Sequence, residues 1–145
     1  MLFNILQKVT SADISLLEIN FTVGFGHYNN LILIISKKYS VKLDVIYPYV
    51  VPAANLVDYE AAKKLPTEEE VEWANKAVYH MLLYMGDLAR YLHDLGQNFW
   101  REIAVRFYDA ALIWNPDIGM PFNQIGTLND NNNHGIDSIY YYMRW

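Results

Sequence analysis

Arg90 is the residue whose surroundings most clearly suggest chemistry. It lies near the end of the segment 81–91, MLLYMGDLARY, in which the other residues are apolar except for Gly86 and Asp87. A guanidinium beside so much apolar surface needs an acidic partner or an anionic ligand. Asp87 and Asp94 lie three residues before and four after it, spacings that place either carboxylate beside Arg90 on a helix. The residues alone favour a structural ion pair and leave an anion-binding site as the alternative.

The other polar residues give weaker indications of a site. His27 has no second ligand at metal spacing, so we expect a partly buried histidine whose hydrogen bonds are satisfied. The segment 130–135, DNNNHG, resembles the start of a calcium loop, but Tyr141 stands where a bidentate glutamate is needed. An enzyme would have to use His80 or His93 with a nearby aspartate, and no such pair has convincing spacing. We therefore expect no metal, no cofactor and no catalytic residues.

Composition indicates one compact domain. The 145 residues are 53% hydrophobic, carry a formal net charge of −5 and include no cysteine. The negative charge argues against a general nucleic-acid or anionic-membrane binder. The most apolar run, residues 31–35, is too short to cross a bilayer, and the first residues lack the basic start and cleavage site of a signal peptide.

Apolar periodicity predicts a mainly helical chain. The expected helices are Ala12–Tyr39, Thr67–Leu95, Phe99–Trp114, Met120–Leu128 and one from Ile136 to the end. Ser11 is the predicted N-cap of the first helix, whereas Thr67 with Glu70 forms a capping box and Gly96 ends the second helix. The apolar surface of the first helix is wide, which predicts burial between neighbours, and Gly24 and Gly26 would permit close approach of another helix.

The segment 40–66 has a different character. Its sequence VIYPYVVP contains two prolines, which exclude a continuous helix, and its tyrosines and valines are expected to cover the core as an ordered loop. A short strand there would have no partner strand. Residues 56–64 are expected to form a helical turn or two.

Small and aromatic residues recur in a tetratricopeptide pattern. The second half of one repeat is matched by Ala104, Tyr108, Ala111 and Pro116, and the opening positions of neighbouring repeats by Leu82, Met85, Gly86, Phe122, Ile125 and Gly126. The pattern predicts antiparallel helix pairs, stacked so that they present a concave peptide-binding face.

Three segments then become specific to a family: YHMLLYMGDLARYLHDLG, AVRFYDAALIWNPDIGMPFNQIGTL and SIYYYMRW. They resemble the 14-3-3-like tetratricopeptide domain of the SMG-five, SMG-six and SMG-seven family of nonsense-mediated mRNA decay factors, relatives of the ever-shorter-telomeres protein. GMPFNQIGTL and RFYDAAL are most similar to the SMG-five branch. The resemblance covers residues 14–144 except the segment 48–70.

The resemblance implies an all-α, right-handed array of stacked helix pairs, with residues 1–145 forming a single, partial 14-3-3-like domain. It also implies a reader of phosphoserine and phosphothreonine, in which Arg90 and Tyr91 grip the phosphate. Asn129 is matched to an asparagine that holds the peptide backbone. The lysine that completes this pocket in 14-3-3 proteins has no assigned counterpart here.

The implied function is that of a non-enzymatic adaptor of nonsense-mediated mRNA decay. Its implied partners are the phosphorylated up-frameshift RNA helicase and an SMG-seven-type domain, with no direct contact to nucleic acid or membrane. The implied location is the cytoplasm, with shuttling to the nucleus allowed. The alternative is a helical protein–protein interaction scaffold whose phosphate site is incomplete.

Overall fold

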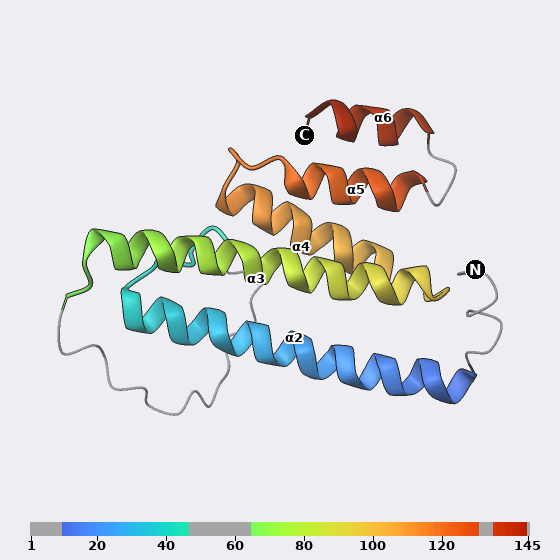
Figure 1. The fold of residues 1–145 in the computed structure, drawn as a ribbon, viewed down its shortest axis with the longest axis horizontal. Helices are drawn as coiled ribbons and strands as arrows, with labels where there is room; N and C mark the ends of the chain where they lie inside the picture. The colour runs from blue at the N-terminus through green and yellow to red at the C-terminus, as the bar shows by residue number, and fades with distance from the viewer. Residues whose placement is uncertain (1–9, 47–64, 131–134, 145) are drawn as a thin grey trace.

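The computed structural model describes residues 10–46, 65–130 and 135–144, with the backbone alone for residues 129, 130, 136 and 137. Over these residues it contains helices and no strand, which confirms the all-α prediction. The helices are α2 (Ser11–Tyr39), α3 (Glu68–Asp94), α4 (Trp100–Trp114), α5 (Met120–Asp130) and α6 (Gly135–Arg144). The predicted helical turns at 56–64 and most of the predicted loop lie outside the described residues. Consecutive helices run in opposite directions and lie against one another in chain order (Figure 1).

The N-terminus of α2 corrects one prediction. The N-cap is Thr10, not Ser11. The Thr10 side-chain oxygen accepts a hydrogen bond from the Asp13 backbone N–H at 3.2 Å, and the Asp13 carboxylate accepts one from the Thr10 N–H at 2.8 Å. Asp13 lies three residues after Thr10 and completes a capping box with it. Ser11 cannot form such a box, because no acidic residue lies three positions after it.

The boundaries of α3 agree closely with prediction. Thr67 and Glu70 form the expected capping box, with hydrogen bonds of 3.2 and 2.8 Å. Gly96 follows the helix with a φ of 91°, a left-handed conformation that favours glycine. The helix itself is one residue shorter at each end than predicted.

The N-terminal half of α2 departs from prediction. Ile32, Leu33 and Ile35 are buried near its C-terminal end, but Leu16 and Val23 are 60% and 66% exposed. The expected burial between two neighbours is therefore wrong for this half of the helix. The reason is that α3 is the main neighbour of α2, so the opposite face of α2 stays open over the part of the chain that the structure describes.

Two glycines allow close packing within the helix pairs α3–α4 and α5–α6. A Cβ added to Gly86 would lie 2.4 Å from Cε1 of Tyr108, and one added to Gly126 would lie 2.7 Å from Cε1 of Tyr142. The two tyrosines are roughly 34 residues apart, the length of a tetratricopeptide repeat. The contact thus recurs as the repeat predicts, although the full tetratricopeptide or 14-3-3 geometry stays a prediction.

The two glycines of α2 differ in how closely another helix approaches them. A Cβ at Gly24 would lie 3.0 Å from Cδ1 of Leu88 on α3, so a close approach to another helix is confirmed there. Gly26 has nothing within 4 Å of that position among the described residues, so no helix approaches it closely.

Candidate functional site

Arg90 lies in the C-terminal half of α3 and is largely buried. Its side chain is 15% exposed. The Arg90 Nη1 donates to Oδ2 of Asp94 at 3.2 Å, and the Nη2 lies 3.8 Å from Oδ1 of Asp87. Both carboxylates that the spacing placed beside Arg90 therefore pair with it, and the guanidinium charge is already partly compensated.

Tyr108 on α4 connects this group to the neighbouring helix. Its ring is fully buried, and its hydroxyl donates to Oδ1 of Asp87 at 2.8 Å. Burial, followed by the Asp87 charge, raises the pKa of Tyr108 well above its ordinary value. The phenol consequently keeps its proton and remains a donor to Asp87 at any physiological pH.

Arg90 is held in its charged form by the same neighbours. Burial lowers the pKa of Arg90, but this effect is outweighed by its hydrogen bond with Tyr108 and by the charges of Asp87 and Asp94. The net result is a raised pKa, so the guanidinium is a permanent cation in this position.

Tyr91 forms the exposed side of the group. The Arg90 Cζ lies 4.5 Å from the centroid of the Tyr91 ring, and Tyr91 is 47% exposed. The Arg90 Nε is buried and has no hydrogen-bond partner among the described residues. A permanent cation beside an exposed phenol has the chemistry to bind an oxyanion.

Asn129, the third residue expected at the site, belongs to α5, which packs on α4 and α6. Its backbone is helical, and its side chain lies outside the described part of the structure. Whether it joins Arg90 and Tyr91 therefore stays a prediction.

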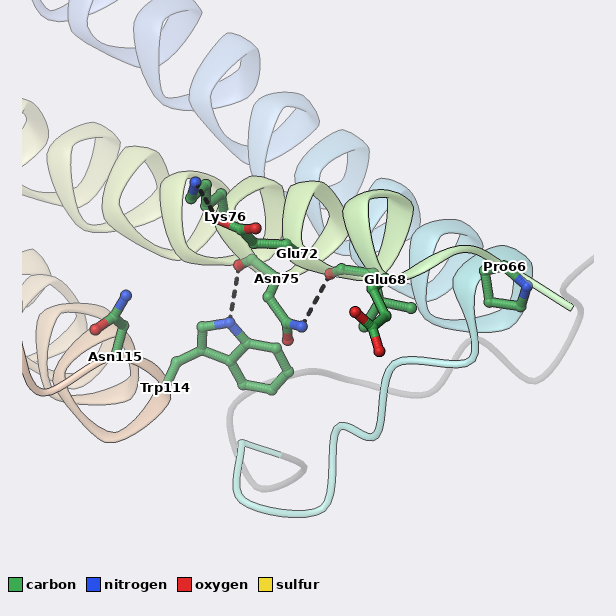
Figure 2. A pocket seen from close by; sticks show the side chains of 8 residues that line it. Pro66, Glu68, Glu72, Asn75, Lys76, Trp114 and Asn115 are labelled. Atoms are coloured by element: carbon green, nitrogen blue, oxygen red, sulfur yellow. Dashed lines mark hydrogen bonds and ion pairs between the residues drawn. The ribbon is translucent and has the colours of Figure 1, made fainter.

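A pocket of about 600 Å³, which no pattern in the sequence indicates, lies at the other end of α3. Figure 2 shows it between the first turns of α3 and the end of α4. The Trp114 Nε1 donates to the Asn75 carbonyl oxygen at 2.9 Å, while Lys76 pairs with Glu72 at 2.6 Å. A contact between residues 39 positions apart depends on how the helices cross, which is why local sequence patterns did not predict it.

An apolar groove of about 340 Å³ lies between α2 and α4. Phe25 on α2 lines it and stacks on Trp100 and Phe107 of α4, with ring centroids 5.5 and 5.7 Å apart. Met85 on α3 also lines it. This groove, which we call the Phe25 groove, and the α3–α4 pocket contain neither Arg90 nor a histidine.

The histidines do not form an acid–base site within the described residues. His27 is exposed, so the prediction of a partly buried side chain is wrong, because it lies on the open side of α2. His80 is exposed as well, and His93 is 8% exposed with no partner for its Nδ1 in the described part of the chain. The same residues include no cluster of three or more potential metal ligands. None of the helices among the described residues is long and apolar enough to span a bilayer.

Comparison with known proteins defines the class of this chain. Residues 14–96 match the family model of the telomerase activating protein Est1, and residues 104–144 match that of the Est1 DNA/RNA binding domain. The first match spans more than half of the chain, so the chain belongs to the Est1 family. No solved structure gives a significant match.

Within this family, the chain is similar to SMG5 proteins. The chain is 36% identical to the nonsense-mediated mRNA decay factor SMG5 of Danio rerio over 124 residues, which cover 83% of this chain and 11% of that protein. It is 34% identical to SMG5 of Homo sapiens over 128 residues, 86% of this chain and 12% of that protein. The telomerase-binding protein EST1A of Danio rerio is 28% identical over 61% of the chain. The predicted family is thus confirmed, and the chain spans about an eighth of the length of its SMG5 relatives.

Proposed function

We propose that this chain is a non-enzymatic adaptor domain of nonsense-mediated mRNA decay. Membership of the Est1 family and similarity to proteins named as SMG5 decay factors support this role. The fold supports it too, because stacked helix pairs present long surfaces for binding peptides and other domains. The proposed place of action is the cytoplasm.

The proposed ligand is a phosphoserine or phosphothreonine segment of the up-frameshift RNA helicase. The observation that carries this assignment is the position of the Arg90 guanidinium 4.5 Å from the ring of the exposed Tyr91. These residues occupy the positions that the family resemblance associates with phosphate. Asn129 would hold the peptide backbone, and a second surface would pair with an SMG-seven-type domain.

Contacts with Arg90 and Tyr91 alone contribute too little binding free energy for micromolar affinity. A hydrogen bond to a charged group contributes about 1.5–3 kcal/mol, whereas micromolar binding needs about 8 kcal/mol. Further cations or contacts with the peptide backbone must supply the remainder. The proposal therefore requires a surface that extends beyond the two residues.

A second candidate is a helical interaction scaffold in which Arg90 is structural. The ion pairs of Arg90 with Asp87 and Asp94 favour it, because they compensate the guanidinium without any ligand. In this case the domain binds protein partners through its apolar surfaces, and phosphorylation of the partner makes no difference.

Titration with a pair of peptides distinguishes the two candidates. A fluorescent Ser-Gln peptide and its phosphorylated form are added to the wild-type domain, to Arg90→Gln and to Arg106→Gln, the last removing an exposed arginine of α4 as a control. The phosphate reader binds the phosphorylated peptide more tightly, loses this preference in Arg90→Gln and keeps it in Arg106→Gln. Equal binding of both peptides, or an unchanged preference in Arg90→Gln, supports the scaffold instead.

Pairing is tested separately by sedimentation of the domain with an SMG-seven-type domain. A complex is expected, and two species that sediment independently would contradict the pairing. Direct nucleic-acid binding is not part of the proposal, because the chain carries a net charge of −5. Retardation of a single-stranded RNA or DNA probe by the domain in a gel would contradict that statement.

A further inference from the structure

The exposed apolar residues of α2 lie on one side of that helix. Leu16, Ile19 and Val23 are 60%, 61% and 66% exposed, although large aliphatic side chains favour the interior. Spacings of three and four residues place them on one face. The face that packs on the rest of the fold, which carries Phe25 and Tyr28, lies opposite. Helix α2 thus has two apolar faces, and the described residues cover only one of them.

The uncovered face has a regular repeat, which we call the α2 stripe. Its positions are separated alternately by four and three residues, the spacing of the a and d positions of a coiled coil. All of them are exposed, and they are Ala12, Leu16, Ile19, Val23, Gly26 and Asn30. A stripe of this kind is typical of a helix that packs lengthwise against one other helix.

Gly26 indicates what the second helix must present. A Cβ added at this position would meet nothing within 4 Å among the described residues, so the fold itself gives no packing reason for a glycine. Glycine is also less favourable than alanine inside a helix. An open glycine on the stripe leaves room for one large side chain of the second helix.

A second copy of α2, antiparallel to the first, supplies that side chain. When two copies are aligned about a two-fold axis level with residue 21, Leu16 of one lies opposite Gly26 of the other. In the same alignment Ile19 lies opposite Val23, and both contacts occur twice by symmetry. A parallel pair would instead place Gly26 against Gly26 and leave a gap. The stripe is therefore complementary to itself in the antiparallel direction.

The residues that flank the stripe are complementary in the same alignment. Asp13 and His27 are exposed and follow d positions, so they lie on one flank. Asp13 of one copy then lies beside His27 of the second, at both ends of the contact. The residue between them, Asn20, lies beside its own counterpart and is uncharged. The other flank is also uncharged and consists of Ser15, Thr22 and Asn29. No like charges meet across either flank.

We propose that the α2 stripe is the interface of a symmetric, antiparallel homodimer of this chain. The inference goes beyond the proposed phosphate-reading function and does not depend on it. The stripe contains fewer than three heptads, so the interface is at the small end of specific interfaces and dissociates at about 10–100 μM. Below that concentration the chain is the monomer described above.

Sedimentation equilibrium of the full chain from about 1 to 500 μM tests the dimer by mass action. Wild type should change from the mass of a monomer to that of a dimer. Ile19→Glu should remain monomeric throughout, because it buries two carboxylates at the centre of the symmetric contact. Ile139→Glu on α6 is a matched control, since Ile19 and Ile139 are 61% and 60% exposed, and it should dimerise like wild type. Circular dichroism and a thermal melt at low concentration confirm that both variants are folded.

Cross-linking tests the antiparallel direction. The chain has no cysteine, so a single introduced cysteine reports the distance between the two copies of one position. Asn20 and Asn30 are both exposed on α2. In the antiparallel pair Asn20 lies beside its counterpart, whereas the two copies of Asn30 are about 27 Å apart along the helices, at about 1.5 Å per residue. A short bis-maleimide should link Asn20→Cys to itself and leave Asn30→Cys unlinked.

The charge at position 27 tests the alignment of the flanks. His27→Lys places a permanent cation beside Asp13 of the second copy and should tighten the dimer about two- to tenfold, a range expected for two exposed ion pairs. His27→Glu should weaken the dimer by a similar factor. Added salt should reduce both effects by screening.

The results that would overturn the dimer are specific. A monomer at every concentration overturns it, as does a dimer that persists in Ile19→Glu and is lost in Ile139→Glu. Equal linking of Asn20→Cys and Asn30→Cys, or equal effects of His27→Lys and His27→Glu, overturns the antiparallel alignment. A chain that stays monomeric alone but loses its complex with an SMG-seven-type domain in Ile19→Glu assigns the stripe to that partner and overturns the homodimer.

Discussion

Tyr108 contributes twice to the contact between α3 and α4. Its ring lies against Gly86, where any larger residue would clash, and its hydroxyl donates to Asp87. Since Asp87 in turn lies beside Arg90, one buried tyrosine fixes both the separation of the two helices and the position of the cation. The stability of the fold and the geometry of the candidate site therefore depend on the same side chain.

Replacing Tyr108 with phenylalanine tests this dual role. The substitution keeps the ring but leaves the half-buried Asp87 carboxylate without its donor, so unfolding should become easier by about 1–3 kcal/mol. Urea denaturation followed by circular dichroism measures the loss. Tyr84→Phe, at a residue 45% exposed, should change the unfolding free energy little. Equal effects of the two substitutions would show that the Tyr108 hydroxyl contributes nothing to stability.

At the scale of single residues, the sequence predicts some of the contacts around Arg90 but not all of them. The ion pairs with Asp87 and Asp94 follow from helical spacing within one segment and were foreseen. The hydrogen bond from Tyr108 was not, because it joins residues 21 positions apart on two helices. A sequence pattern places Tyr108 between helices, but the acceptor of its hydroxyl depends on how α3 and α4 cross.

At the scale of the element, the two long helices begin in the same way. Thr10 with Asp13 starts α2, and Thr67 with Glu70 starts α3, each through a reciprocal pair of hydrogen bonds. The sequence predicts the cap at Thr67 but not the one at Thr10, where the adjacent Ser11 is also a good N-cap residue. An acidic residue three positions after the cap therefore determines which of two neighbouring residues is the N-cap.

Loss of the cap at α3 should be measurable. Thr67→Ala removes the acceptor for the Glu70 N–H and should lower the unfolding free energy by about 1 kcal/mol. Thr22→Ala is a suitable control, because Thr22 lies inside α2 and its hydroxyl bonds only locally to the Glu18 carbonyl. Thermal denaturation should show a drop in melting temperature for Thr67→Ala alone. A comparable drop in both variants would mean that the cap has no special role.

Gly26 of α2 and Gly86 of α3 should respond to alanine in opposite directions. Gly86→Ala would place a methyl group against the Tyr108 ring, and overpacking less the gain in helix propensity should cost about 1–2 kcal/mol. Gly26→Ala meets nothing within 4 Å in the described structure and should stabilise by about 0.5–1 kcal/mol. Denaturant unfolding of the two variants in parallel checks the signs. Stabilisation by Gly86→Ala would exclude the tight contact with Tyr108.

At the scale of the whole molecule, the described helices form a row in which each packs mainly on its neighbours in the chain. In Figure 1 the chain passes back and forth from α2 to α6. Phe25 makes an exception, since it reaches from α2 to the rings of Trp100 and Phe107 on α4. The Phe25 groove is therefore where the N-terminal half of α2 is attached to something other than α3.

Phe25→Ala should loosen that attachment. Losing a half-buried ring should cost about 2 kcal/mol, less than for a fully buried phenylalanine. Hydrogen exchange should accelerate most in the N-terminal half of α2, because local opening follows the loss of local contacts. Leu16→Ala, at a residue 60% exposed, should leave the exchange pattern unchanged. Uniform acceleration through α3 and α4 would show instead that α2 opens only with the whole fold.

The sequence predicted the row of helices well and its surface poorly. Periodicity and caps are local, so the boundaries of α2, α3 and α4 were right to within about a residue. Whether an apolar face is covered depends on the path of other helices, which is why Leu16 and Val23 were expected in the interior and are exposed.

The placement of two tryptophans provides optical probes at both ends of the α3–α4 pair. Trp100 stacks on Phe25 at the start of α4, and Trp114 donates to the Asn75 carbonyl at its end. Each indole emission should shift to longer wavelength when its own contact opens to water. Comparing Trp100→Phe with Trp114→Phe during unfolding would therefore show whether the α2–α4 contact or the α3–α4 contact opens first.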